Sequence, residues 1–167
     1  LKAPPPIFYV DDVPLYELID DHEAFCESEG ARGAAARLPE VDFRSVRRLA
    51  GRRLSGLSAR DSILFGLDLS GAQLQGADLS GCDLRKANLR GADLRGARLT
   101  GAQLIRADLR EARLGPLQIG EGRLLRTDLN RAILRYADLS GVQAQRARFL
   151  EADLAGANLT GADLRGA

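Results

Sequence analysis

The sequence predicts an all-β solenoid, in which short extended segments wind into stacked coils, preceded by one α-helix. Self-similarity is the first observation: of the 21 positions read every fifth residue from Leu64 to Leu164, 18 are Leu. Ala occupies 14 of the 21 positions that come two residues earlier. Aromatic residues are 5% of the chain, and Trp and Met are absent, so the core must consist of Leu and Ala.

A period of five residues fits neither an α-helix nor a flat strand, whose periods are 3.6 and 2. In an α-helix the leucines would spread around the circumference, and each Gly in the repeat would cost about 1 kcal/mol relative to Ala. A bent path resolves the conflict, because each unit can form one short extended side and a turn at the Gly or small polar residue. Leu and the Ala two residues before it then point inward. The predicted core includes Leu69, Ala72, Leu74, Ala77, Leu79, Cys82, Leu84, Leu89, Leu94, Leu109, Leu129 and Phe149.

The unit can be written Ala-Asp-Leu-x-Gly, and residues 66–114 follow it almost without departure, as in Gly76-Ala77-Asp78-Leu79-Ser80. In this respect the sequence resembles the pentapeptide-repeat family. The resemblance implies a right-handed, four-sided (quadrilateral) parallel β-helix with four repeats, or roughly 20 residues, per coil. Coils should stack at about 4.8 Å, the spacing of hydrogen-bonded strands.

The five-residue frame continues through an atypical stretch at residues 115–124. Leu117 takes one Ala position and Gly122 takes the next. We interpret this pair as local volume compensation inside a packed core, with one oversized and one undersized residue. The alternative is a bulge that marks a binding site.

The chain is expected to divide into an N-terminal segment, residues 1–35, and the repeat solenoid, residues 36–167, which becomes regular from about residue 62. One extra residue near Val46–Leu49 shifts the frame and predicts an irregular first coil. The repeat runs to Ala167, so we expect either further chain beyond it or end-to-end pairing with a second copy.

Helical spacing in the N-terminal segment predicts an α-helix that contains Leu15, Leu18, Ile19, His22, Phe25 and Cys26 on its apolar face. Pro14 suits its first turn and Gly30 suits its end. Ile7–Val10 is expected to be extended. Because the open end of a β-solenoid invites aggregation, we expect the helix to cover it.

Charge is strongly segregated although the net charge is +1. Residues 11–29 hold eight acidic residues and no Lys or Arg, whereas residues 62–167 hold fifteen basic and twelve acidic residues. If residues 20 apart stack, a basic column flanked by outward apolar residues forms one face. That face is the candidate binding surface for an acidic protein partner, and it consists of Lys86, Ile105, Arg106, Leu125, Arg126 and Arg146. The alternative is that the face is an ordinary solvated surface with scattered apolar residues.

No constellation of residues in the sequence indicates catalysis, a cofactor or a metal. The single histidine, His22, lies on the helix between apolar positions, and Cys82 takes an inward Ala position. Two isolated cysteines form neither a disulfide framework nor a zinc motif, which favours a reducing compartment such as the cytoplasm. The recurrent Asp or Asn before each Leu is expected to bind turn backbone. No segment has the run of about 20 apolar residues that crosses a membrane.

These observations predict a non-catalytic structural or protein-interaction scaffold. The family resemblance supplies an alternative, since some pentapeptide-repeat proteins bind DNA gyrase and protect it from quinolones, several of them by resembling duplex DNA. A DNA mimic needs an acidic rod, so the basic excess in residues 62–167 argues against it. Direct nucleic-acid binding is a third hypothesis, weakened by interleaved acids and few aromatic residues. A small-molecule substrate is not expected, because Leu and Ala fill the interior.

Overall fold

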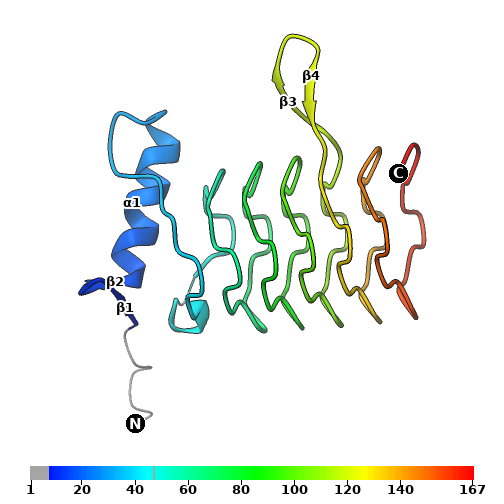
Figure 1. The fold of residues 1–167 in the computed structure, drawn as a ribbon, viewed down its shortest axis with the longest axis horizontal. Coiled ribbons are helices and arrows are strands. Elements are labelled where there is room, and N and C mark those ends of the chain that lie inside the picture. Colours follow the sequence, from blue (N-terminus) through cyan, green and yellow to red (C-terminus); the bar gives the residue numbers. More distant parts are fainter. Residues whose placement is uncertain (1–7, 47) are drawn as a thin grey trace.

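The computed structural model describes residues 8–46 and 48–167, and it has an α-helix at one end of a row of coils (Figure 1). Strands β1 (Tyr9–Val10) and β2 (Val13–Pro14) form a small antiparallel hairpin that leads into helix α1 (Leu15–Glu27). A 3₁₀ turn, η1 (Phe43–Ser45), lies in the first coil. Strands β3 (Leu117–Gly120) and β4 (Arg123–Leu125) form a second hairpin, which projects from the row of coils in Figure 1. Of the segment expected to be extended, Ile7 lies outside the described residues.

Parallel bridges between residues 20 apart hold successive coils together. Four such bridges join two successive regular coils, as in Ser58↔Asp78, Ile63↔Asp83, Asp68↔Asn88 and Gln73↔Asp93. Leu89 lies between Leu69 and Leu109 in this stack, because Leu69 donates to the Asn88 carbonyl and Leu89 to the Asp108 carbonyl, each at 2.7 Å. One coil therefore contains four of the five-residue repeats in this part of the chain.

In the regular coils each corner is a β-turn with a left-handed residue at its second central position. At one corner the Ala77 N–H donates to the Leu74 carbonyl at 3.1 Å, and Gly76 has a φ of +66°. A positive φ at only the second central residue is the pattern of a type II turn, which favours Gly there. Lys86, Arg106 and Tyr136 adopt the same conformation with φ of +57°. The Gly of the repeat therefore occupies the left-handed position of the turn, and at some corners another residue adopts this conformation instead.

The core consists of the Leu and Ala columns. Eleven of the twelve core residues named from the sequence are at most 1% exposed, and Phe149 is partly buried because it lies in the last coil of the sequence. Cys82 lies among them, and its Sγ donates to the Ala59 carbonyl at 2.9 Å. Leu and Ala therefore fill the interior of these coils.

The first coil is one residue longer than those that follow. The bridges Arg37↔Ser58 and Asp42↔Ile63 join residues 21 apart, whereas Arg53↔Gln73 joins residues 20 apart. The extra residue thus lies between residues 42 and 53, which agrees with the frame shift expected near Val46–Leu49. Elsewhere in this coil the buried Ser62 hydroxyl bridges the turn of residues 38–41, since it accepts from the Val41 N–H and donates to the Leu38 carbonyl, both at 2.9 Å.

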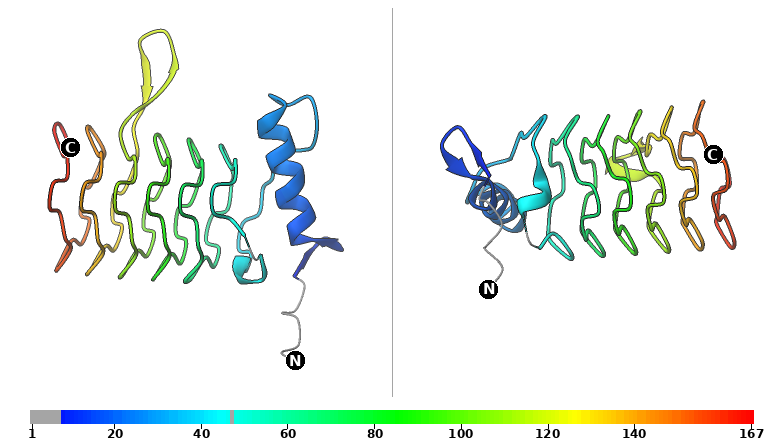
Figure 2. Two further views of the ribbon diagram at one scale, coloured as in Figure 1. Left: turned by 180° about the vertical axis from the view of Figure 1, so that it is seen from behind. Right: turned by 90° about the horizontal axis from the view of Figure 1, so that it is seen from below.

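Helix α1 lies beside the first coil in both views of Figure 2. Leu15, Ile19 and His22 are its buried residues, and His22 Nδ1 accepts from the Ala36 N–H at 3.0 Å. From the coil side, Arg52 forms ion pairs with Asp20 at 2.6 Å and Glu23 at 2.7 Å. Apolar contact and these polar bonds together join the helix to the first coil.

Residues 116–125 leave the coil, so the interpretation of this stretch as volume compensation is wrong. Across it the bridges join residues 30 apart, as in Arg98↔Asp128, Gln103↔Ile133 and Asp108↔Asp138. The hairpin of β3 and β4 is therefore a ten-residue insertion between repeats. Its length equals two repeats, which is why the five-residue frame continues unchanged on both sides.

Candidate partner-binding surfaces

The insertion separates the six residues that the sequence predicted to form one face. Lys86 and Arg106 do share a column, but the next residue of that column is Tyr136, since the Arg106 N–H donates to the Arg135 carbonyl at 2.9 Å. Arg126 and Arg146 belong to the column that contains Gly96, half a coil from Lys86, and Leu125 lies beside Gly96 at the base of the hairpin. The expected basic column is thus divided between two opposite corners.

The first corner combines cations with aromatic side chains, and we call it the corner surface: Phe65, Arg85, Lys86, Ile105, Arg106, Arg135 and Tyr136. The Arg85 guanidinium lies 5.5 Å and Lys86 Nζ 5.8 Å from the centroid of the Phe65 ring, as in cation–π pairs. Tyr136 is 63% exposed. Sequence reasoning missed both aromatic residues. Tyr136 could be placed only with the ten-residue hairpin removed from the count, whereas Phe65 lies 20 residues before Arg85, so the regular frame already placed it in this column.

The opposite corner carries the β3–β4 hairpin, and we call it the hairpin surface: Ile119, Arg123, Leu124, Leu125, Arg126, Arg146 and Arg148. Leu117 and Leu125 hold the base of the hairpin against Gly96, where an added Cβ would lie 2.9 Å from Leu117 Cβ and 3.1 Å from Leu125 Cδ2. Farther out, Ile119 and Leu124 are 47% and 46% exposed. The hairpin thus holds apolar side chains in solvent beside arginines.

The Thr127 side chain replaces a hydrogen bond between coils at the point where the hairpin leaves the coil. In an uninterrupted corner the Gly76 N–H donates to the Arg95 carbonyl of the next coil at 3.0 Å. The equivalent partner of Gly96 is Gly115, but here Thr127 Oγ1 stands between them: it accepts from the Gly96 N–H at 2.9 Å and lies 3.1 Å from the Gly115 carbonyl oxygen. Thr127 Oγ1 is equally close to the Leu94 carbonyl oxygen, at 3.1 Å, and its single proton can be donated to one of these two carbonyls at a time. Thr127 is fully buried, so this hydroxyl replaces a backbone bond that the insertion opened.

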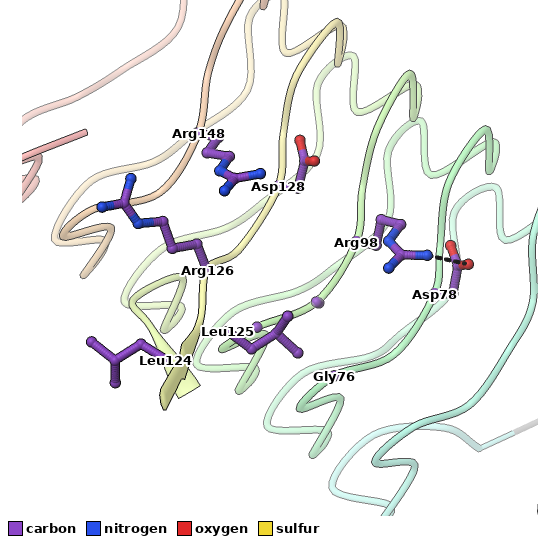
Figure 3. A pocket seen from close by; sticks show the side chains of 10 residues that line it. Gly76, Asp78, Arg98, Leu124, Leu125, Arg126, Asp128 and Arg148 are labelled. Atoms are coloured by element: carbon purple, nitrogen blue, oxygen red, sulfur yellow. Dashed lines mark ion pairs between the residues drawn. The ribbon is translucent and has the colours of Figure 1, made fainter. Parts of the chain in front are cut away.

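A cavity of about 290 Å³ lies between the base of the hairpin and the neighbouring coils (Figure 3). Leu124 and Leu125 form its apolar side, and Arg98, Arg126 and Arg148 bring three positive charges to it. Asp78 and Asp128 also line the cavity, and Asp78 pairs with Arg98 at 3.5 Å. Within residues 8–46 and 48–167, Arg126 and Arg148 form no ion pair. Two guanidinium groups with free donors therefore border a partly apolar cavity.

The Asp residues before the core leucines bind their own turns, as the sequence suggested. Asp108 Oδ1 accepts from the Arg110 N–H at 3.1 Å, and Asp138 Oδ1 accepts from the Ser140 N–H at 3.0 Å. The hydrogen bond from the Arg110 guanidinium is the main reason that the pKa of Asp108 lies below its usual value. These carboxylates are thus engaged in holding turns and side-chain ion pairs.

The two cysteines and the single histidine lie at buried or partly buried positions. Burial raises the pKa of the Cys82 thiol to about 12, and burial lowers the pKa of His22. Cys26 Sγ lies 3.6 Å from His22 Nε2, and burial raises the pKa of Cys26, which favours the thiol over the reactive thiolate. Among the described residues no group of three or more His, Cys, Asp or Glu side chains could hold a metal ion. None of the helices formed by these residues is long and apolar enough to cross a membrane.

Comparison with known proteins identifies the repeat. The family described as Pentapeptide repeats matches in eight copies, over residues 48–81, 77–115, 121–149 and 132–167, together more than half of the chain. No curated protein matches the sequence.

Similar solved structures include Rfr23 from the cyanobacterium Cyanothece 51142, with 22% identity over 78% of this chain and 81% of that chain and a TM-score of 0.36. The plasmid-mediated fluoroquinolone resistance protein QnrB1 has 21% identity over 80% and 74% of the two chains, with a TM-score of 0.38. HetL from Nostoc sp. strain PCC 7120, which is involved in regulation of heterocyst differentiation, has 35% identity over 78% and 60%, with a TM-score of 0.30. On the match of its repeats, the chain belongs to the pentapeptide-repeat family, whose members fold as right-handed β-helices.

Proposed function

We propose that this protein is a non-catalytic scaffold, a four-sided β-helix covered at its N-terminal end by α1, which presents the hairpin surface to an acidic protein partner. The single observation that carries the proposal is the hairpin itself. A ten-residue insertion leaves an otherwise regular coil and keeps Ile119 and Leu124 about half exposed beside Arg123 and Arg126.

Two features of the solenoid support a role in recognition. Its interior is filled by Leu and Ala side chains that are almost completely buried, so ligands have to bind on the outside. Apolar side chains in the middle of a surface and arginines around them are the usual composition of a protein-binding site. The unpaired guanidinium groups of Arg126 and Arg148 favour carboxylates, which they can bind through two parallel hydrogen bonds.

Deletion of residues 116–125 tests the proposal directly. The deletion joins Gly115 to Arg126 and gives Arg98 and Asp128 the same spacing as bridged residues in the uninterrupted coils, so the coil remains in register. We expect the variant to fold but to capture no specific protein from an extract of cells that produce this protein. The matched control is Lys86→Glu with Arg106→Glu on the corner surface, which should retain capture. Equal capture by the wild type and the deletion variant would exclude the hairpin as the recognition element.

Binding to DNA gyrase is the second candidate, and it comes from family resemblance. A supercoiling assay with and without a fluoroquinolone tests it, because a gyrase-binding protein would change supercoiling or drug inhibition. The excess of basic residues in the solenoid argues for an acidic partner surface instead, and we expect no effect in this assay.

A further inference from the structure

The N-terminal part of the chain has the opposite character to the hairpin surface. It exposes acidic side chains that form no ion pair with any of the described residues, and we call them the acidic surface: Asp11, Asp12, Glu17, Asp21, Glu27 and Glu29. Large apolar side chains are exposed beside them, with Phe8 38%, Tyr9 53% and Tyr16 46% accessible. Asp20 and Glu23 are different, because both bind Arg52 of the first coil.

We propose that a second copy of this chain is a ligand of the hairpin surface, and that it docks through its acidic surface, on α1 and the residues that flank it. This inference rests on the proposed function and names the partner. The two surfaces are complementary: unpaired carboxylates with exposed aromatic rings at the N-terminal end, and the unpaired guanidinium groups of Arg126 and Arg148 with exposed Ile119 and Leu124 on the hairpin. Asp128, which also lines the cavity, offsets only part of the positive charge there. Complementary charge steers and orients such a contact, while the apolar side chains contribute the burial.

The two surfaces of one molecule are too far apart to meet. Helix α1 lies at the end of the row of coils, and several coils separate it from the β3–β4 hairpin in Figures 1 and 2. The contact must therefore join two copies. If both copies exchange the same contact, a closed dimer forms; a one-way contact would instead generate rings or longer assemblies.

The cavity at the base of the hairpin supplies the most specific part of the interface. Arg126 and Arg148 border it beside the apolar wall of Leu124 and Leu125, and its volume of about 290 Å³ admits an acidic side chain. A carboxylate of α1 would find guanidinium donors there and an aliphatic surface for its methylene groups. Since both surfaces are solvent-exposed, the attraction should weaken steeply as salt shortens the screening length from about 10 Å at 0.1 M.

Sedimentation equilibrium of the intact protein measures the association. We expect wild type to self-associate at an ionic strength of about 0.05 M, with at least a tenfold larger dissociation constant at about 0.5 M. Two charge-reversed variants dissect the contact: Arg123→Glu with Arg126→Glu and Arg148→Glu on the hairpin surface, and Glu17→Arg with Asp21→Arg and Glu27→Arg on α1. Each alone should be monomeric, since like charges would then face each other. A mixture of the two should associate, because the reversed surfaces attract again.

The mixture of the two variants distinguishes a lost contact from misfolding, because two misfolded variants would not regain association when mixed. The control with Lys86→Glu and Arg106→Glu should associate like wild type. A wild type that stays monomeric at low salt, or a mixture that does not associate, overturns the inference. Binding of a single-stranded oligonucleotide is measured in parallel. A hairpin variant that still self-associates but no longer binds the oligonucleotide also overturns the inference, because the arginines would then bind phosphate groups. None of these results touches the capture experiment with the 116–125 deletion, so the proposed function can stand if the second copy is not the partner.

Discussion

Removal of the Thr127 hydroxyl should destabilise the protein only while the hairpin is present. Thr127→Val keeps the shape of the side chain but removes the oxygen that accepts from the Gly96 N–H at 2.9 Å. Among the residues that the structure describes, this amide has no other acceptor, because the Thr127 hydroxyl lies between it and the Gly115 carbonyl. A buried N–H without a partner costs about 1–3 kcal/mol, so we expect the free energy of unfolding to fall by about that amount.

The same substitution should be nearly neutral after deletion of residues 116–125. With the coil closed, Gly96 can donate directly to Gly115, as Gly76 donates to Arg95 at 3.0 Å. The hydroxyl is then surplus, and its removal should change stability by less than about 0.5 kcal/mol, the usual limit for a substitution that breaks no such feature. The double-mutant cycle should therefore give a coupling energy of about 0.5–3 kcal/mol, as expected for groups that share one hydrogen-bond network.

Urea-induced unfolding of the four proteins supplies the stabilities, and amide hydrogen exchange of Gly96 supplies a local readout. In the full-length protein Thr127→Val should accelerate exchange of this amide, while in the deletion variant the rate should stay unchanged. Thr127→Ser is the control, because it restores the oxygen and should retain most of the stability. Equal losses from Thr127→Val in both backgrounds would refute the reasoning, since the hydroxyl would then not act as the bridge.

Three further outcomes follow from the same structure. Gly96→Ala should lower the free energy of unfolding, measured by thermal unfolding, by at least about 1 kcal/mol more than Gly91→Ala, because only the new Cβ at residue 96 would clash with Leu117. This difference should vanish when residues 116–125 are deleted. Burial lowers the pKa of His22 below its usual 6.5, so the unfolded chain binds more protons than the folded protein below pH 6.5. The free energy of unfolding should therefore decline as pH falls through this value, and it should decline less in His22→Asn. A free energy of unfolding that does not change with pH in the wild type would contradict this. With its pKa raised to about 12 and its side chain buried, Cys82 should not react with a thiol reagent at pH 8 until the protein unfolds, as mass spectrometry of the labelled peptides can check.

The repeat predicted most of the solenoid because its physical cause is local. Every fifth Leu and the Ala before it occupy the same inward positions in each coil, so core residues such as Leu89 and Cys82 could be identified without a structure. The N-terminal helix was equally readable, because the apolar spacing from Leu15 to Cys26 matches α1, Leu15–Glu27.

The hairpin could not be read from periodicity, because its length is a multiple of five and leaves the frame intact. Other signals were present. Pro116 begins the stretch, Gly120 and Gly122 lie at its centre with positive φ, and Leu117 stands where the coil needs Ala. Turn residues between two short apolar runs indicate a β-hairpin, and this signal should have outweighed the preserved frame.

That error changed the functional prediction, because side chains were assigned to columns on the assumption that every coil has the same length. Arg126 appeared to stack on Arg106, although the column of Arg106 continues to Tyr136. The predicted single face became two surfaces at opposite corners. Contacts between coils depend on the total length of chain between them, which local sequence patterns do not report.

Disulfide trapping tests the central claim, that Asp128 stacks on Arg98 in the resumed coil while the hairpin is displayed outside it. Neighbouring parallel strands lie about 4.8 Å apart, within the range of Cα separations that a disulfide can bridge. In a background with Cys26→Ser and Cys82→Ala, we expect Arg98→Cys with Asp128→Cys to form an intramolecular disulfide readily and without loss of stability. Arg98→Cys with Gln118→Cys, the pair that an uninterrupted coil would stack, should remain reduced under the same oxidant. Efficient bonding of residues 98 and 118, with none between 98 and 128, would contradict the account.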